Sequence, residues 1–314
     1  MARQELDAKF EAGPVNIIPL AVGRFTGYSN SFSTFSPNET DKMRFWGSTG
    51  GTVNTHIQRV DDSVDSRLLD LHRMRHIIEP SATFFTAATN RDSSTLPIYD
   101  EDVEAIAKGS SFRAGVNQIW QTQRGRPGHY YSVDVFTLDM NYVDSTKETD
   151  LRSPVGRFFD YRPELSSFGK YGNVDAVWRV TDATSLTGGT VYDFDLESQA
   201  RTSAGIIVQQ SPDVTASLDY RYLNALSLTT LGAGVAYRLA NQYTLNLTTS
   251  YDLTSNQFQG AGAEIRRDFQ SMRLGFNIAH NNISGETSVG FTLTPRIGES
   301  RGRIPILGEQ APAR

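Results

Sequence analysis

The chain has 314 residues, a formal net charge of −5 and no cysteine. These values exclude a disulfide framework and a cysteine-based metal or redox site, and the basic excess typical of nucleic-acid-binding proteins is absent from the composition. No apolar run approaches the roughly 18–20 residues that a membrane-spanning helix requires.

Taken in chain order, the sequence predicts a leader, a long series of strands and a tail. Residues 1–14 are expected to form an N-terminal leader segment, and they lack the apolar stretch of a signal peptide. Residues 15–294 predict about 14 strands separated by turn residues. The expected strands are 15–28, 44–60, 74–87, 111–124, 129–144, 171–182, 184–196, 201–210, 213–223, 226–239, 242–253, 256–268, 271–281 and 284–294. Residues 295–314, which are rich in Gly, Pro and Arg, are expected to form a flexible tail.

The segment Tyr243–Leu253 shows the strand pattern most clearly. Its odd positions are mostly Tyr and Leu, and its even positions are Thr, Asn, Ser and Asp. Alternation with a period of two is typical of a strand with one apolar face and one polar face. The same pattern recurs in most of the expected strands of the second half of the chain.

A meander of this length predicts an all-β fold, an antiparallel up-and-down transmembrane barrel. A barrel of about 14 strands has a lumen too wide for side chains to fill, so the polar face would line water and the apolar face would meet lipid. Aromatic residues near strand ends fit the girdles at the two membrane surfaces. The girdle candidates are Tyr28, Trp46, Trp120, Tyr131, Tyr142, Tyr192, Tyr243 and Phe258. A soluble β-sandwich gives the same alternation and stays open as an alternative.

The stretch "RHIIEPSATF", Arg75 to Phe84, contains a proline inside an apparent strand. Proline cannot donate a ladder hydrogen bond, so Pro80 predicts a bulge or a strand entry near a rim of the barrel. Arg75 and His76 would then lie at the watery end, with Phe84 and Phe85 toward the bilayer.

This stretch resembles the Arg-His-x-x-x-Pro strand of the outer-membrane LPS-assembly family LptD. The loop "LPIYDEDVEAI" and the strand "SSFRAGVNQIWQTQRG" that follow are also similar to that family, and the resemblance extends over about 60–314, the C-terminal portion of its barrel. The residues that carry the resemblance are Arg75, His76, Pro80, Pro97 and Asp100.

The resemblance implies a translocon component in the Gram-negative outer membrane that inserts lipopolysaccharide, or a related glycolipid, into the outer leaflet. It also implies three partners: lipopolysaccharide, an LptE-like lipoprotein plug and an LptA-like periplasmic bridge protein. Arg152, Arg157 and Arg162 are candidate contacts for lipid phosphates, because arginine binds phosphate through two parallel hydrogen bonds. An ordinary solvated loop is the alternative interpretation of these three residues.

Three other functions remain open from the sequence: a passive porin-like channel, a soluble β-sandwich binding module and a barrel hydrolase. The five histidines are scattered, and no partner for a catalytic site is evident. His72 and His76 have a spacing that could bind metal on a helix, but a third ligand is not evident. The sequence therefore predicts no enzyme, no cofactor and no metal site.

Overall fold

The computed structural model describes residues 1–31, 33, 42–92, 95–96, 108–146 and 169–295. Its regular structure consists of 17 strands within these ranges and a short 3-10 helix at Asn224–Leu226. Within the same ranges, no helix has the length and apolar character needed to cross a membrane.

The first part of the chain contains the longest strands, three of which have 17 residues or more. Their bounds are β1 Ala2–Asp7, β2 Phe10–Ala12, β3 Val15–Gly27, β4 Met43–Thr55, β5 Ile57–Ser66, β6 Leu71–Thr89, β7 Gly109–Arg126, β8 His129–Ser145, β9 Lys170–Arg179 and β10 Thr184–Asp193.

The strands of the second part have 10 to 14 residues and are joined by short turns. Their bounds are β11 Ser198–Ser211, β12 Val214–Leu223, β13 Leu228–Ala240, β14 Tyr243–Asp252, β15 Gln257–Asp268, β16 Met272–Asn281 and β17 Glu286–Pro295.

The chain divides into two compact units. Unit 1 comprises Met1–Asp175 and Thr190–Gln199, and unit 2 comprises Ala176–Gly189 and Ala200–Arg314. β9, β10 and β11 contribute residues to both units, and each unit is described below by itself.

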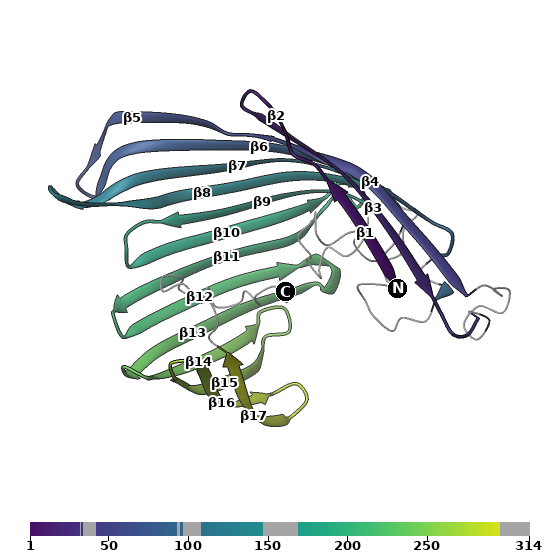
Figure 1. The fold of residues 1–314 in the computed structure, drawn as a ribbon. Helices are drawn as coiled ribbons and strands as arrows, with labels where there is room; N and C mark the ends of the chain where they lie inside the picture. Colours follow the sequence, from purple (N-terminus) through teal and green to yellow (C-terminus); the bar gives the residue numbers. More distant parts are fainter. Residues whose placement is uncertain (32, 34–41, 93–94, 97–107, 147–168, 296–314) are drawn as a thin grey trace. The chain divides into compact units, whose positions relative to one another are not determined.

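Unit 1 is an antiparallel sheet in which the 19-residue strand β6 has a central place (Figure 1). One edge of β6 pairs with β7 along nearly its whole length, and β7 pairs in turn with β8. The other edge of β6 is shared: Ser81 to Thr89 pair with β4, and Leu71 to Ile78 pair with β5. β4 pairs with β3, which also pairs with β1 and β2.

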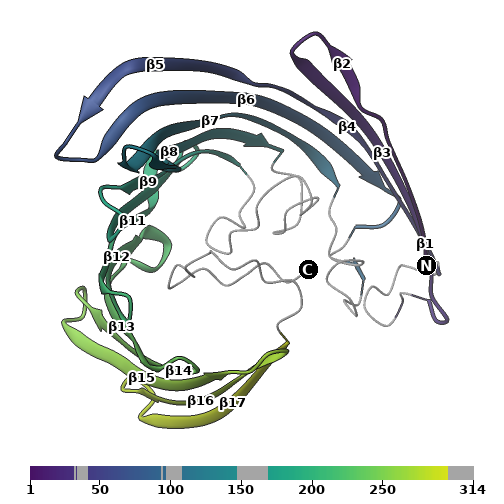
Figure 2. The ribbon, with the colours of Figure 1, turned by 60° about the vertical axis from the view of Figure 1, so that its left-hand side comes forward.

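Unit 2 is a meander in which each strand from β11 to β17 pairs antiparallel with the next one along the chain (Figure 2). The predicted class is therefore confirmed: the fold is all-β, antiparallel and up-and-down. The strand count differs from the prediction of about 14. Two of the additional strands, β1 and β2, lie within residues 1–14, and the expected strand 44–60 is divided at His56 into β4 and β5.

The apolar face of unit 2 is exposed over β12 to β17. Cross-strand neighbours on this face carry aliphatic or aromatic side chains, and Val235, Leu247 and Val289 expose 40%, 45% and 60% of their surface. One complete cross-strand row consists of Ala216, Val235, Leu247, Ala263, Ile278 and Val289. A contiguous apolar surface of this size is unfavourable in water and is typical of a lipid-facing sheet.

The apolar face of unit 1 is bounded by two aromatic cross-strand pairs between β6 and β7. Phe84 pairs with Phe112, and eight residues along the strand His76 pairs with Trp120. Eight residues of antiparallel strand rise about 27 Å, which at a tilt of about 40° spans about 21 Å of membrane. This height is close to that of the apolar band of outer-membrane barrels.

A buried apolar cluster lies on the opposite face of unit 1. It consists of Leu20, Val22, Trp46, Phe85 and Ala87, and the rings of Trp46 and Phe85 are stacked with centroids 6.4 Å apart. Two expectations are therefore wrong: Trp46 belongs to this core instead of an exposed girdle, and Phe85, which is fully buried, points away from the apolar face on which Phe84 lies. Period-two alternation places adjacent residues on opposite faces, so Phe84 and Phe85 cannot both face lipid.

The two faces of β14 give a direct test of the lipid-facing assignment. Leu247→Arg places a charge at the middle of the apolar face and is expected to lower the free energy of unfolding by about 2–4 kcal/mol in phospholipid vesicles. Thr248→Arg places the same charge on the polar face and is expected to cost less than about 1 kcal/mol. Urea-induced unfolding in vesicles measures both values, and equal losses would contradict the assignment.

Candidate functional site

The polar face of unit 2 is the candidate functional surface. Across β12 to β17 its middle row has no side chain larger than threonine. This row consists of Ser217, Gly234, Thr248, Gly262, Ala279 and Ser288. The two adjacent rows are Thr215, Ala236, Asn246, Glu264, Asn277 and Gly290, and Asp219, Gly232, Ser250, Gly260, Asn281 and Glu286.

In these three rows of β12 to β17, alanine is the largest apolar side chain. Such a face cannot form a packed core, because a core needs large apolar side chains to exclude water and fill volume. Glycine, serine, threonine and amide side chains are instead compatible with a water-filled surface. The β-sandwich interpretation fails for unit 2 on the other face: a sandwich would bury the apolar face against a second sheet, whereas Val289 and Phe291 expose 60% and 77% of their surface.

Glycines on this face provide space for the long polar side chains of adjacent strands. A methyl group on Gly232 would lie 2.5 Å from Oδ1 of Asp219, and one on Gly290 would lie 2.6 Å from Oδ1 of Asn277. Glu264 reaches over Gly275 in the same way. The polar side chains therefore lie flat along the sheet.

Unit 1 has a chain of hydrogen bonds on the face that also carries its buried cluster. Glu79 of β6 joins two neighbours: its Oε1 lies 3.3 Å from Nδ1 of His56, and its Oε2 accepts a hydrogen bond of 3.1 Å from Nδ2 of Asn117. On β3 and β4, Asn16 donates to Asn54 at 3.0 Å. Amide and carboxylate groups on this face of unit 1 thus satisfy one another's hydrogen-bonding capacity.

The Glu79 bridge can be tested by two substitutions. Glu79→Ala removes the acceptor for both neighbours and is expected to lower stability by about 1 kcal/mol, because the groups are half-exposed. Glu79→Gln keeps an acceptor and a similar volume, and is expected to lose clearly less. The free energies of unfolding of the two variants decide the matter: indistinguishable values would show that the bridge contributes nothing.

Two of the residues that carry the family resemblance lie on opposite faces of β6. Arg75 donates from Nε to Oε1 of Gln58 at 2.9 Å and contacts Gln121 on the other side. The ring of His76 is stacked on Trp120 with centroids 4.3 Å apart, and its Nε2 lies 3.1 Å from Oε1 of Gln118. Both residues therefore have local partners that explain their presence.

Pro80 lies at the middle of the apolar band, not at a rim. Its register with Val116 of β7 is continuous, so β6 has no bulge at this residue. The discontinuity is in the neighbouring strand, since β4 ends at Thr55 and β5 begins at Ile57 opposite this part of β6. A missing hydrogen-bond donor costs least where the partner strand changes.

The other predicted site residues lie outside the described residues. These are Pro97 and Asp100 in the loop after β6, and Arg152, Arg157 and Arg162 in the loop after β8. The structure therefore leaves the lipid-phosphate prediction untested.

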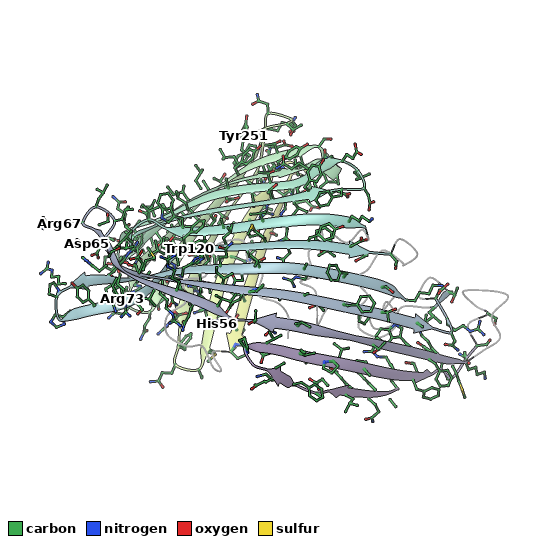
Figure 3. All side chains as sticks on the ribbon, turned by 90° about the horizontal axis from the view of Figure 1, so that it is seen from above. His56, Asp65, Arg67, Arg73, Trp120 and Tyr251 are labelled. Atoms are coloured by element: carbon green, nitrogen blue, oxygen red, sulfur yellow. The ribbon has the colours of Figure 1, made fainter. Side chains whose placement is uncertain are left out.

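His72 lies at one end of unit 1, beside the β5–β6 turn. Its Nδ1 is 2.8 Å from Oδ1 of Asp65, its Nε2 is 3.2 Å from Oδ1 of Asp70, and Asp70 also accepts the Gly125 backbone N–H at 3.1 Å. In Figure 3, Asp65 and Arg73 appear at this end, with His56 and Trp120 farther along the strands. Across the described residues, no three His, Asp or Glu side chains form a group that could hold a metal ion.

Nearby, two local hydrogen bonds lower the pKa of Asp61 of β5. Ser63 donates to Oδ1 of Asp61 from its hydroxyl at 2.6 Å and from its backbone N–H at 3.0 Å. The hydroxyl hydrogen bond, followed by the backbone one, holds the pKa of Asp61 below its usual value. Asp61 pairs with Met74 and therefore lies outside the apolar band, beyond the aromatic pair of His76 and Trp120.

Comparison with known proteins favours a porin over the family predicted from the sequence. The family model described as "Opacity family porin protein" matches residues 158–271, a stretch that includes β9 to β15. No curated protein matches the chain. The predicted membership of the LPS-assembly family LptD is therefore wrong, as is the translocon function drawn from it. Its defining residues on β6 have the local structural roles described above.

Solved porin structures are among the neighbours of the fold. A multiply substituted variant of the Rh. blastica porin is 10% identical, with a TM-score of 0.42 and coverage of 93% of this chain and 96% of the other. A triple mutant of the Rhodopseudomonas blastica porin is also 10% identical, with a TM-score of 0.41 and coverage of 93% and 97%. TM-scores this low do not establish a shared fold.

The chain is an integral β-barrel protein of the outer membrane. Its exposed apolar faces and its match to a porin description agree on this location, as predicted. The matched description is that of a porin and not of an enzyme. The strand pattern already places glycines such as Gly232 and Gly234 on the polar face, but which long side chain lies over each glycine follows only from the strand registers.

Proposed function

We propose that this protein is a passive, porin-like channel that lets small hydrophilic solutes cross the outer membrane. This was the alternative to the glycolipid-assembly hypothesis. The observation that carries it is the polar face of β12 to β17, whose three central rows contain no apolar side chain larger than alanine. The porin description that matches residues 158–271 supports the same function.

The physical basis of the proposed transport is solvation. A solute that passes along Ser, Thr, Asn and Gly side chains exchanges water hydrogen bonds for similar ones, so it loses little free energy on entry. No covalent step and no energy source are required. Flat-lying carboxylates and amides, held over glycines, keep the passage wide.

Conductance measurements test this function directly. The protein, folded in detergent and identified by its shift in mobility on boiling in SDS, is added to a planar lipid bilayer. Stepwise, long-lived increases in conductance are expected. A protein that shows the heat shift but produces no conductance steps would overturn the proposal.

The glycine recesses give a sharper prediction about the width of the channel. Gly232→Val places side-chain atoms where the Asp219 carboxylate lies, so Asp219 is displaced from the wall and the single-channel conductance is expected to fall. Ala233→Val adds side-chain volume to the next residue on the apolar face and serves as the control, with unchanged conductance expected. The same conductance in both variants would show that the recess does not determine the width.

A further inference from the structure

Three arginines gather at one end of the polar face of unit 2. Arg238 of β13 and Arg266 of β15 are both cross-strand neighbours of Thr244 on β14, and Arg273 of β16 lies beside Asp268. This end is the one at which short turns connect β13 to β14 and β15 to β16. We call Arg238, Thr244, Arg266 and Arg273 the basic row.

Two carboxylates lie near the basic row and neutralise part of its charge. Asp268 accepts a hydrogen bond of 2.8 Å from Nε of Arg273, and its Oδ1 is 3.9 Å from Nε of Arg266. Glu264 accepts a hydrogen bond from Asn246 at 2.9 Å. Three guanidinium groups therefore face two carboxylates, and the closest pairing occupies Arg273.

Arg238 and Arg266 retain their hydrogen-bonding capacity. Within the described residues, the side chain of Arg238 takes part in no hydrogen bond or ion pair, and Nε of Arg266 is buried without a hydrogen bond, its ion pair with Asp268 being the long one of 3.9 Å. Because the two residues are separated by one strand, their Cα atoms are about 10 Å apart, which two long side chains can bridge. The Thr244 hydroxyl lies between them as a further donor.

The surroundings leave this row accessible. Arg238 is exposed and the middle row of the face contains only small residues, whereas Glu264 extends over Gly275, the neighbour of Arg266 on β16. The opposite end of the face has a different charge pattern, in which Asp219, Asp252 and Glu286 accompany a single guanidinium, that of Arg221. The guanidinium groups are thus concentrated at one end.

We propose that the basic row is a binding site for small anions with several oxygen acceptors, the class of inorganic phosphate. Arg238 and Arg266 bind the anion through forked pairs of N–H donors, and Thr244 adds a hydroxyl hydrogen bond. The site favours free anionic solutes over lipid phosphates, because it lies on the polar face. Its use in selecting solutes rests on the proposed channel function.

The next residue in the sequence provides a matched control. Arg267 lies on the apolar face, where its guanidinium is 5.2 Å from the ring centroid of Tyr243 and 4.7 Å from that of Phe269. Such a position suits contact with the membrane surface. Removing the charge of Arg267 changes the net charge by the same amount as removing one arginine of the basic row. The change then affects the apolar face and leaves the polar face intact.

Phosphate binding to the folded protein in nonionic detergent tests the proposal, with calorimetry as the readout and the heat shift as the control for folding. Wild-type and R267Q are expected to bind inorganic phosphate equally. The double variant R238Q/R266Q is expected to bind at least about tenfold more weakly, since charge-assisted hydrogen bonds are lost. R238K/R266K keeps the charges but loses the forked donors, so intermediate affinity is expected; it replaces the glutamine pair if that variant does not fold.

The outcomes separate this inference from the channel proposal. Absence of phosphate binding by the wild-type protein, equal binding by R238Q/R266Q, or a loss on R267Q instead would overturn the inference. Vesicles with anionic phospholipid form a second arm, in which binding that depends on the basic row would assign it to lipid. Phosphate binding without conductance steps would overturn the channel and leave the anion site standing.

Discussion

The alternation of side chains along a strand is the constraint on which both units depend. A strand presents successive residues to opposite faces, so one sheet cannot bury both faces without a second layer. In unit 2 the exposed apolar row of Val235, Leu247 and Val289 lies behind the small polar row of Gly234, Thr248 and Ser288. Lipid on one face and water on the other satisfy both rows.

The two units meet this constraint differently. Unit 2 keeps its polar face free of large apolar side chains over β12 to β17, whereas unit 1 places the buried group around Trp46 and Phe85 on the corresponding face. Unit 1 also contains longer strands, which continue beyond the aromatic pair of His76 and Trp120 into polar groups such as Arg75 and His72. The two units therefore differ in what covers the face opposite their apolar one.

Period-two alternation was enough to predict the fold class and most strands, because each strand of β12 to β17 carries a full polar and a full apolar face. It failed where the answer depends on neighbouring strands. The sequence predicts a single strand over residues 44–60, yet their partners change at His56, and the effect on Pro80 is visible only in the pairing of β6. The family resemblance failed for a related reason. Arg75 contacts Gln58, His76 is stacked on Trp120, and Pro80 lies opposite the junction of β4 and β5. Many barrels could share such local contacts. Arg266 and its exposed neighbours became a site only when the registers of β13 to β16 were known.

The pairing of long polar residues with glycines has a consequence for how the sheet is assembled. Asn141 lies opposite Gly115, and Asn277 lies opposite Gly290. A slip of one residue would exchange the two faces, which lipid forbids. A slip of two residues would preserve the faces, but it would set Asn141 against Arg113 or Asn117, and Asn277 against Ser288 or Thr292. The glycine recesses therefore favour one register. The repeated alternation alone would be compatible with several alignments of the strands, and the recesses distinguish among them.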